Sequence, residues 1–540
     1  MTTSDRNPLF TISDIDKRQL TAAAFAAILI AIPIILMVPM YLDDFLRAVT
    51  GSYKWSKDGR PLAEFIYRSM GFDSASLSLT SPLGMLLCIP GICFSSVLLC
   101  KIFRNQKIWA AALAAIFLFG QPYFLANLSF SFDSPMMVLA IFFSLCSAYL
   151  IVCVRRRKAF LASIFLQVCC LSLYQAANSA MWIPVLLAAI FPTVSNKKLQ
   201  EESPLSIARV LKRPYLYLLP SLLLSQFISL AAYRFIVLNN IYLNRYARQH
   251  SALPHLIDLP FTLFTNIEDY LLRFYADWQN TNFGTVFLIF LLITSIYAVL
   301  ISSRSFDFKL ALHRNDLVSA LSLVTSLLFV VIVFLFSYGL PLILTNPVFE
   351  PRTFIGIGVF MASISMIATR DSEFIIDTFR CGLNYNNIRN FVVLMVISAA
   401  AWACIFNLFA FSNAYSKQQK LNNYFLGSIV QEIRNKGYGN DDINIVEIIG
   451  HGPYDPSVVN TFRTLPYLRS LIRPVSDWSI GMEGKNMLMH YGFTELKNRY
   501  VVKKDVKSIS SDKFFDLFTS DKSLIIKFRQ PLKPKINTDS

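Results

Sequence analysis

The sequence predicts a polytopic α-helical membrane protein of about eleven spans, followed by a small extracytoplasmic α/β domain. Three observations carry this prediction. Hydrophobic residues make up 54% of the 540 residues and charged residues only 16%, with a mean hydropathy of +0.48. The apolar residues fall into separate runs, most of them long enough for a membrane-spanning helix. Beyond residue 412 the apolar runs become short and charged residues become frequent.

The predicted spans are the uninterrupted apolar runs. A helix needs about 20 apolar residues to cross the hydrocarbon core of a bilayer. The two runs within 159–193 have two interpretations, either two spans or one span followed by a re-entrant hairpin. The predicted spans are 18–40, 81–100, 108–125, 133–154, 159–175, 177–193, 214–237, 282–302, 317–338, 353–369 and 390–412.

Lysine and arginine are concentrated in alternate connections between these spans. The positive-inside rule places the basic connections in the cytoplasm. Residues 1–17 then form a cytoplasmic tail, and 413–540 form a periplasmic domain. The cytoplasmic basic residues also account for the net charge of +16 without a nucleic-acid partner. Eighteen of them lie in 101–107, 155–158, 196–213, 303–316 and 370–390, whereas the external loops 126–132 and 339–352 hold one.

The C-terminal region has the pattern of a small α/β domain. Residues 416–440 have the apolar spacing of an amphipathic helix. The run INIVEIIG at 443–450 predicts a buried strand that ends in a glycine-rich turn, and the runs at 498–504 and 522–528 predict further strands.

No metal, cofactor or disulfide is expected. All nine cysteines lie in or beside apolar segments, without a Cys-x-x-Cys or Cys/His spacing. His250 and His255 lie in the long external loop 238–281 without a third ligand nearby in the sequence. The N-terminus has no apolar core with a cleavage site, so we expect a retained tail and no signal peptide.

The first external loop, 41–80, begins with a cluster of charges. Asp43, Asp44 and Arg47 lie within one helical turn, so one carboxylate can pair with the arginine while the other stays free. Alternatively, these charges only mark the end of a membrane span. Two neighbouring acids raise the pKa of one of them, which suits a general base for a sugar hydroxyl. Trp55, further along this loop, is either an interfacial anchor or a platform for a sugar ring.

Three further groups are predicted to face the same side. Asp133 begins a span, where it is either a catalytic acid or a charge favoured by the helix dipole. Tyr174 and Gln175 end another span and either line a site or bond between helices. Glu350 and Arg352 end an external loop that is otherwise free of basic residues. Arg352 is therefore a candidate for binding a phosphate group. Alternatively, its side chain only extends from the bilayer to the membrane surface.

These segments resemble the phage-encoded, serotype-converting O-antigen glucosyltransferases, the glucosyl transferase II family. The first motif, YLDDFLRAVTGSYKWSKDGRPLAEF, is the most specific, because five separated residue types coincide with the family signature. The resemblance extends over nearly the whole chain. Its shorter motifs are NLSFSFDSPMM, LYQAANS, EPRTFIG and IVEIIGHGP.

The resemblance implies a GT-C-type glycosyltransferase of the bacterial inner membrane, with a membrane domain at 18–412 and a periplasmic active site. Such enzymes transfer glucose from undecaprenyl phosphate-glucose to an O-antigen repeat unit of lipopolysaccharide. A small flippase and a donor-synthesising glycosyltransferase are implied as functional partners. If the donor linkage is β and the product linkage is α, the reaction inverts, and no covalent glycosyl-enzyme forms.

The resemblance also implies roles for the external residues. Asp44 takes the proton of the acceptor hydroxyl and Asp43 holds Arg47 or sugar hydroxyls, although the two acids can exchange roles. Asp133 is the second acid and orients a substrate. Arginines bind the donor phosphate, and polar or aromatic side chains bind the sugar. These are Arg352, Arg60 and Arg47 for the phosphate, and Trp55, Tyr174, Gln175 and Glu350 for the sugar.

Three alternatives remain open at this point. Another GT-C enzyme would use a different lipid-linked sugar or another envelope glycan, which product analysis distinguishes. A transporter or flippase of lipid-linked saccharides would place charges near the middle of the membrane and would contain internal repeats. A non-catalytic receptor would leave the acidic cluster at 43–44 without a role.

Overall fold

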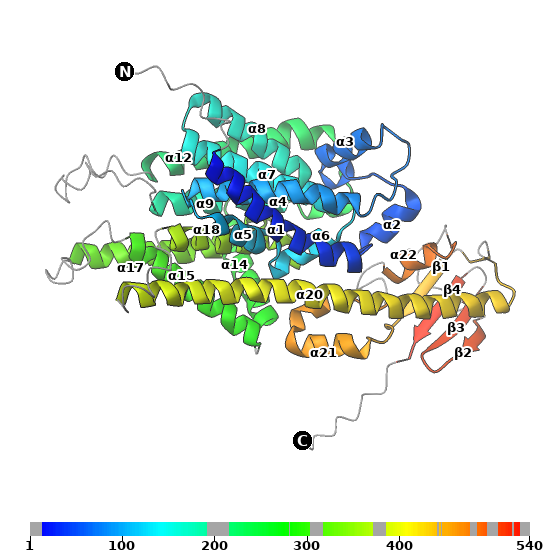
Figure 1. The fold of residues 1–540 in the computed structure, drawn as a ribbon. Coiled ribbons are helices and arrows are strands. Elements are labelled where there is room, and N and C mark those ends of the chain that lie inside the picture. Colours follow the sequence, from blue (N-terminus) through cyan, green and yellow to red (C-terminus); the bar gives the residue numbers. More distant parts are fainter. Residues whose placement is uncertain are drawn as a thin grey trace.

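The protein is a helical bundle with a small sheet at one end (Figure 1). The computed structural model describes residues 13–191, 215–279, 281–302, 317–370, 385–439, 442–443, 445–475, 483–493, 506–520 and 523–529. The main helices of the bundle are α1 (Asp14–Met37), α4 (Leu83–Ile102), α5 (Ile108–Phe119), α7 (Ser134–Tyr149), α8 (Arg157–Leu173), α9 (Ser179–Ile190), α12 (Tyr215–Ala232), α14 (Leu259–Trp278), α15 (Asn282–Ser302), α17 (Leu317–Leu335), α18 (Ile355–Arg370) and α20 (Tyr385–Asn435).

The long apolar helices are typical of a membrane protein. Within the described residues, six helices are long and apolar enough to cross a bilayer, or seven if one bent pair counts as a single span. That pair, Ile108–Phe119 and Pro122–Ser129, bends by 58°. Every predicted apolar run contains a helix, but several of these helices are short, including α9 and α18. The prediction of about eleven spans is therefore not confirmed.

Helix α18 lies at the centre of the bundle. It is apolar on all sides, and every residue from Ile355 to Thr369 is buried. It packs against α5, α9 and α15. A helix that is hydrophobic all round is stable only where other helices surround it. Because α18 follows directly on the loop that carries Glu350 and Arg352, its fixed position also fixes that loop.

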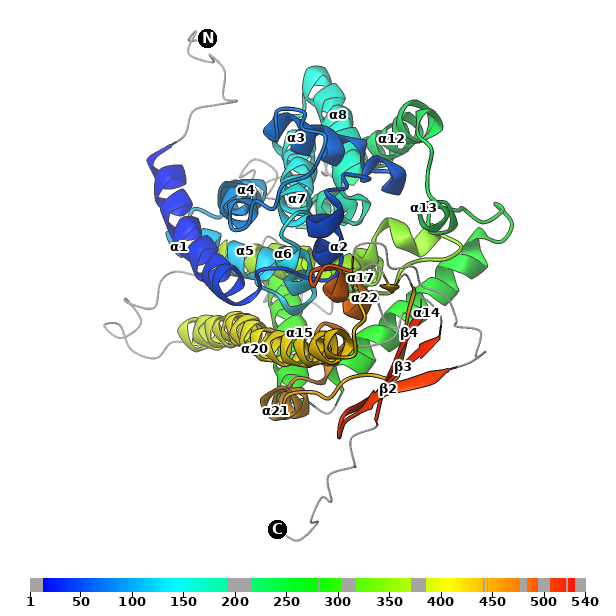
Figure 2. The same cartoon turned by 90° about the vertical axis from the view of Figure 1, so that its right-hand side faces the viewer.

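The loop 41–80, which the sequence predicts to be external, folds into short helices at the same end of the molecule as the sheet (Figures 1 and 2). These are α2 (Asp43–Thr50), a 3-10 turn at Ser56–Asp58 and α3 (Pro61–Met70). Gly51 and Gly59 end the first two in the left-handed region, with φ of 61° and 77°. Glycine adopts this conformation without the penalty that a Cβ atom brings.

Helix α20 runs along the bundle and continues to the C-terminal sheet (Figure 1). It comprises 51 residues. The predicted last span at 390–412 and most of the predicted amphipathic helix at 416–440 are therefore parts of one helix. The boundary expected between residues 412 and 413 falls inside this helix.

The C-terminal sheet has the strand order β1-β4-β3-β2. Its strands are β1 (Ile445–Ile449), β2 (Lys507–Ser511), β3 (Phe515–Ser520) and β4 (Ser523–Phe528). β1 pairs with β4 in parallel, and the other neighbours are antiparallel. The strands predicted within 443–450 and 522–528 are confirmed, while the strand predicted at 498–504 lies outside the described residues.

The C-terminal region packs in two ways. The sheet, helix α22 (Glu483–Met489) and the end of α20 form a separate hydrophobic core, which also receives Phe45 from α2. By contrast, α21 (Pro456–Thr464) and the 3-10 helix Pro466–Ser470 contribute to the core of the bundle itself. The segment around Pro466–Ser470 therefore belongs structurally to the membrane domain.

Candidate functional site

Asp44 is a buried acid that ties two loops together. Its side chain has no exposed surface. One carboxylate oxygen accepts backbone N–H groups of Tyr41 at 3.0 Å and Ser131 at 2.7 Å, and the other accepts that of Phe132 at 3.4 Å. Burial raises the pKa of Asp44 to about 8, although these hydrogen bonds act in the opposite direction. That pKa would suit a general base. A general base must contact its substrate, however, and the Asp44 carboxylate is buried.

We expect the stability of the protein to fall as pH rises from about 4 to about 8, because of Asp44. The pKa of an aspartate in an unfolded chain is about 3.9, whereas that of Asp44 in the folded protein is about 8. Between these values the folded protein holds a proton that the unfolded chain releases, so raising the pH favours unfolding. The Tm of the purified protein across this range measures the effect. Asp44→Asn should flatten the profile, and an unchanged slope would contradict its assignment to Asp44.

Asp43 has the opposite environment. It is exposed and makes no hydrogen bond or ion pair with any described residue. Its charge acts on Arg352: burial lowers the pKa of this arginine, but the charges of Glu350 and, to a smaller extent, Asp43 raise it above its ordinary value. Asp43 is therefore near enough to the loop before the central helix α18 for its charge to act on Arg352.

Asp133 is the centre of a buried cluster at the start of α7. One carboxylate oxygen accepts the indole N–H of Trp55 at 2.7 Å and lies 3.2 Å from Arg60. The other oxygen lies 3.7 Å from Arg47. The spacing of the first motif predicted that Arg47 pairs with Asp43 or Asp44. The structure instead pairs it with Asp133, because a buried carboxylate needs cationic partners.

Trp55 forms part of this cluster and is not available to a sugar. It has no exposed surface, it stacks on Tyr67 with ring centroids 4.8 Å apart, and Arg47 lies 4.1 Å from its ring. Neither an interfacial anchor nor a sugar platform fits this position. The aromatic ring and the indole N–H of Trp55 instead hold Arg47 and Asp133 in place.

Tyr174 and Gln175 connect the loop 41–80 to the loop of Arg352 and to the turn after helix α12. The Tyr174 hydroxyl donates to the carbonyl oxygen of Arg352 at 2.9 Å, and Arg60 lies 4.8 Å from the Tyr174 ring. The Gln175 amide donates to the carbonyl oxygen of Gly59 at 3.1 Å and to the Tyr233 hydroxyl at 2.8 Å. Both residues therefore form hydrogen bonds between segments, which is one of the two roles that the sequence analysis left open for them.

Arg352 and Glu350 line a cavity of about 180 Å³. Arg352 donates to Glu350 at 2.7 Å, and its backbone carbonyl also accepts the amide of the buried Asn127 at 3.1 Å. The other lining residues are Tyr41, Leu42, Ala126, Phe130, Arg273, Phe349, Pro351, Ser470, Leu471 and Arg473. Asp43 does not itself line the cavity, but Tyr41 and Leu42 immediately precede it and its charge acts on Arg352, so this acid lies near the cavity.

The structure thus separates the predicted residues into two groups. Arg352, Glu350 and Asp43 lie at or beside the cavity, whereas Asp133 binds the predicted phosphate ligands Arg47 and Arg60 in a neighbouring cluster. Sequence reasoning missed the cavity residues Arg273 and Arg473. Arg273 lies on α14, within the segment 238–281 that the sequence predicts to be an external loop, so the sequence predicts a side of the membrane for it. No local signal marks Arg473.

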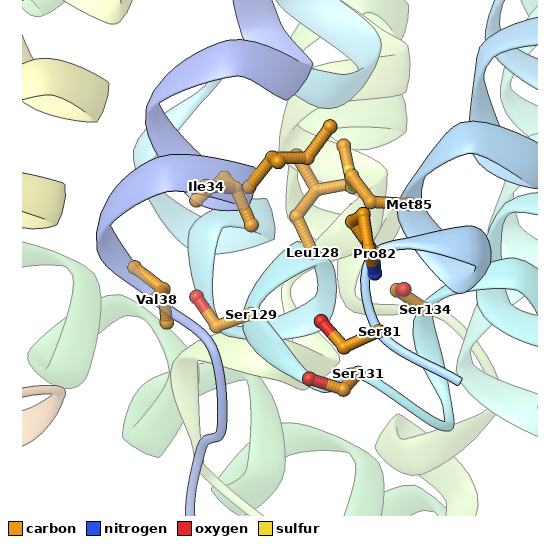
Figure 3. Close-up of a pocket in the computed structure, with 10 residues that line it drawn as sticks. Ile34, Val38, Ser81, Pro82, Met85, Leu128, Ser129, Ser131 and Ser134 are labelled. Carbon is orange, nitrogen blue, oxygen red and sulfur yellow. The ribbon is translucent and has the colours of Figure 1, made fainter. Parts of the chain in front are cut away.

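A second cavity, between α1, α4 and the turn before α7, is too small for a sugar (Figure 3). Its volume is about 10 Å³, which is the space that a single water molecule needs. Serine hydroxyls and apolar side chains surround it, among them Ser81, Ser129, Ser131, Ser134, Ile34, Met85 and Leu128. In the part of the chain that the structure describes, no three His, Cys, Asp or Glu side chains are placed to hold a metal ion.

Comparison with known proteins identifies the family. A family model described as glucosyl transferase GtrII matches residues 32–363, a range that includes Asp43, Asp133 and Arg352. A protein of Salmonella phage P22, named as an uncharacterized 55.3 kDa protein in the gtrB 5′ region, is 27% identical over 515 residues, covering 93% of this chain and 96% of that protein. No solved structure matches the chain. The resemblance read from the motifs is confirmed: the chain belongs to the glucosyl transferase GtrII family and is a membrane glycosyltransferase of O-antigen modification.

Proposed function

We propose that the enzyme transfers glucose from undecaprenyl phosphate-glucose to a repeat unit of the lipopolysaccharide O-antigen, at the periplasmic face of the inner membrane. The observation that carries this proposal is the position of Asp43. It is an exposed carboxylate beside an arginine-lined cavity, a few residues after the first apolar helix ends. Glycosyl transfer from a lipid phosphate needs a base for the acceptor hydroxyl and cations for the leaving phosphate.

Asp43, rather than Asp44, is the base in this proposal. The acceptor hydroxyl oxygen attacks C1 of the glucose, and its proton passes to Asp43. The bond between C1 and the phosphate oxygen breaks, and its electron pair remains on the phosphate. A single displacement of this kind inverts the configuration at C1. Asp44 acts as a positioning residue, because its hydrogen bonds to Tyr41, Ser131 and Phe132 hold the start of α2 against the turn before α7.

The cavity supplies the remaining groups. Arg352 stabilises the negative charge that develops on the departing phosphate. Glu350, which is partly exposed and ion-paired to Arg352, is placed to accept hydroxyl groups of the glucose. Tyr174 supports both sides of the site, since it contacts the Arg60 side chain and the backbone of Arg352.

The periplasmic location rests on the basic connections, which place the loops 41–80 and 339–352 on the side opposite the cytoplasm. The donor lipid is then made in the cytoplasm by a separate glycosyltransferase and moved across the membrane by a small flippase. The phage P22 relative is named for its position in the region 5′ of gtrB, and a neighbouring gene fits such a functional partner.

The donor can be tested with the purified protein in lipid vesicles. We expect transfer of glucose from undecaprenyl phosphate-glucose to O-antigen and none from a nucleotide-linked glucose, because the proposed site receives a membrane-anchored phosphate. NMR of the product should show the anomeric configuration opposite to that of the donor. Transfer from the nucleotide sugar, or a product with the donor configuration, would overturn the corresponding part of the proposal.

A further inference from the structure

The cavity beside Asp43 is lined by arginines from three distant parts of the chain. Arg352 precedes α18, Arg273 lies on α14, and Arg473 follows the 3-10 helix Pro466–Ser470. Among the described residues that line the cavity, Glu350 is the only one with a carboxylate. Three arginines around one partly enclosed space give it a positive potential that attracts an anion, even though Arg352 is ion-paired to Glu350 and Arg273 to Asp277. Arginine also matches the geometry of phosphate oxygens better than lysine does.

One guanidinium nitrogen of Arg273 has an ion-pair partner, whereas another has no hydrogen-bond acceptor. It lies 3.3 Å from the buried Asp277, one turn further along α14. Its Nε atom is buried and makes no hydrogen bond within the described residues. A buried donor without an acceptor is rare in folded proteins and calls for a specific explanation. An anionic group in the cavity that Arg273 lines would supply one.

The segment that carries Arg473 is fixed to the membrane domain. The Tyr41 hydroxyl donates to the carbonyl oxygen of Leu471 at 3.0 Å. The Tyr467 ring lies 5.1 Å from that of Trp278 at the end of α14. The Asn422 amide on α20 donates to the carbonyl oxygen of Arg473 at 3.2 Å. The C-terminal region thus forms one wall of the cavity.

Helix α14 also carries exposed apolar side chains, with the exposed Glu268 among them. Four of its side chains, Phe261, Phe264, Leu272 and Tyr275, are more than half exposed. The helix that carries Arg273 therefore combines a cationic contribution to the cavity with apolar side chains that suit a lipid environment. This combination fits a ligand that joins an anionic head group to an apolar tail.

We propose that Arg273, Arg352 and Arg473 together bind the phosphate group of a polyprenyl phosphate, so that the C-terminal region supplies part of the substrate site. The inference deepens the proposed function and rests on it for the identity of the lipid as the sugar donor. The cavity volume of about 180 Å³ accommodates a head group but not a whole lipid, whose tail remains in the bilayer.

The binding of undecaprenyl phosphate to the full-length protein in nanodiscs tests this inference. We expect Arg473→Gln and Arg273→Gln each to raise the Kd about tenfold or more, because each removes charge-assisted hydrogen bonds to the phosphate. Arg469→Gln is the matched control, since Arg469 is exposed, lies in the same segment and does not line the cavity. Undecaprenol should bind weakly to every variant, because it lacks the phosphate.

The possible outcomes separate the inference from the proposed function. Equal Kd values for the wild type, Arg473→Gln and Arg469→Gln would overturn the inference, even in a preparation that transfers glucose. Arginine-dependent binding without glucose transfer would support the phosphate site and count against the proposed function. Inorganic phosphate that binds as tightly as the lipid phosphate would overturn the assignment to a lipid. Arg473→Lys keeps the charge and should regain part of the affinity, whereas a loss equal to that of Arg473→Gln with a lowered Tm would indicate a purely structural role.

Discussion

Asp43→Asn is expected to lower the rate of glucose transfer by about 10²- to 10⁴-fold, which is the usual contribution of a general base. The protein should remain folded, because Asp43 is exposed and makes no hydrogen bond or ion pair with a described residue. Its position at the start of α2 contributes at most about 1 kcal/mol through the helix dipole. The loss should appear in kcat, with the affinity for the donor lipid much less affected, and steady-state kinetics of the purified protein would measure both.

Asp73→Asn provides the matched control for this prediction. Asp73 lies in the same loop, 41–80, and its side chain is 81% exposed. Among the described residues it forms an ion pair with Arg68 at 3.4 Å. Its φ of 57° is one that asparagine tolerates well. The two variants lose the same charge, so equal rates for both would show that Asp43 is not the base.

Asp133→Asn is expected to act mainly on stability. Removing this carboxylate leaves Arg47 and Arg60 without their anionic partner in a buried cluster, which costs on the order of 3–5 kcal/mol. The Tm of the purified protein should fall by several degrees, and activity should fall with the folded fraction. Thermal unfolding followed together with transfer rate distinguishes this result from the effect at Asp43.

A second substitution isolates the cause. If the loss comes from the uncompensated charge of Arg60, the double variant Asp133→Asn, Arg60→Gln should be less destabilised than the sum of the two single variants. A strictly additive result, or an Asp133→Asn protein with an unchanged Tm and abolished transfer, would mean that Asp133 acts in the chemistry instead.

The helical framework could be predicted from the sequence because each apolar run contains a helix, although several of these helices are too short to confirm a span. The continuity of α20 was missed for a physical reason. Its composition changes from apolar to polar near residue 412, and this change was interpreted as a domain boundary. No proline lies between Tyr385 and Asn435, however, so nothing breaks the backbone hydrogen bonds at that point. A change of environment is not by itself the end of a helix.

The first motif shows what local spacing can and cannot establish. Consecutive residues on a helix point about 100° apart, so Asp43 and Asp44 have different surroundings. Which one is buried depends on the turn at 131–132, whose backbone binds Asp44. The partner of Arg47 was equally out of reach, because Asp133 is distant in sequence and local spacing offered two nearer acids.

Arg473 is a cavity residue that the sequence alone did not reveal. It lies in a polar C-terminal region that the sequence separates from the membrane domain, with no motif to mark it. Only the packing of Tyr467 against Trp278 and the hydrogen bond from Tyr41 to Leu471 bring it to the cavity. Such a residue becomes visible once the chain is folded.

The most direct test is the glycosyl composition and linkage of the O-antigen from cells that synthesise and flip the donor lipid. The wild-type protein should add a glucose side branch, Asp73→Asn should do the same, and Asp43→Asn should add none at equal expression and membrane insertion. A wild-type strain without added glucose, or an Asp43→Asn strain with as much glucose as the wild type, would contradict the assignment of glucosyl transfer to this surface.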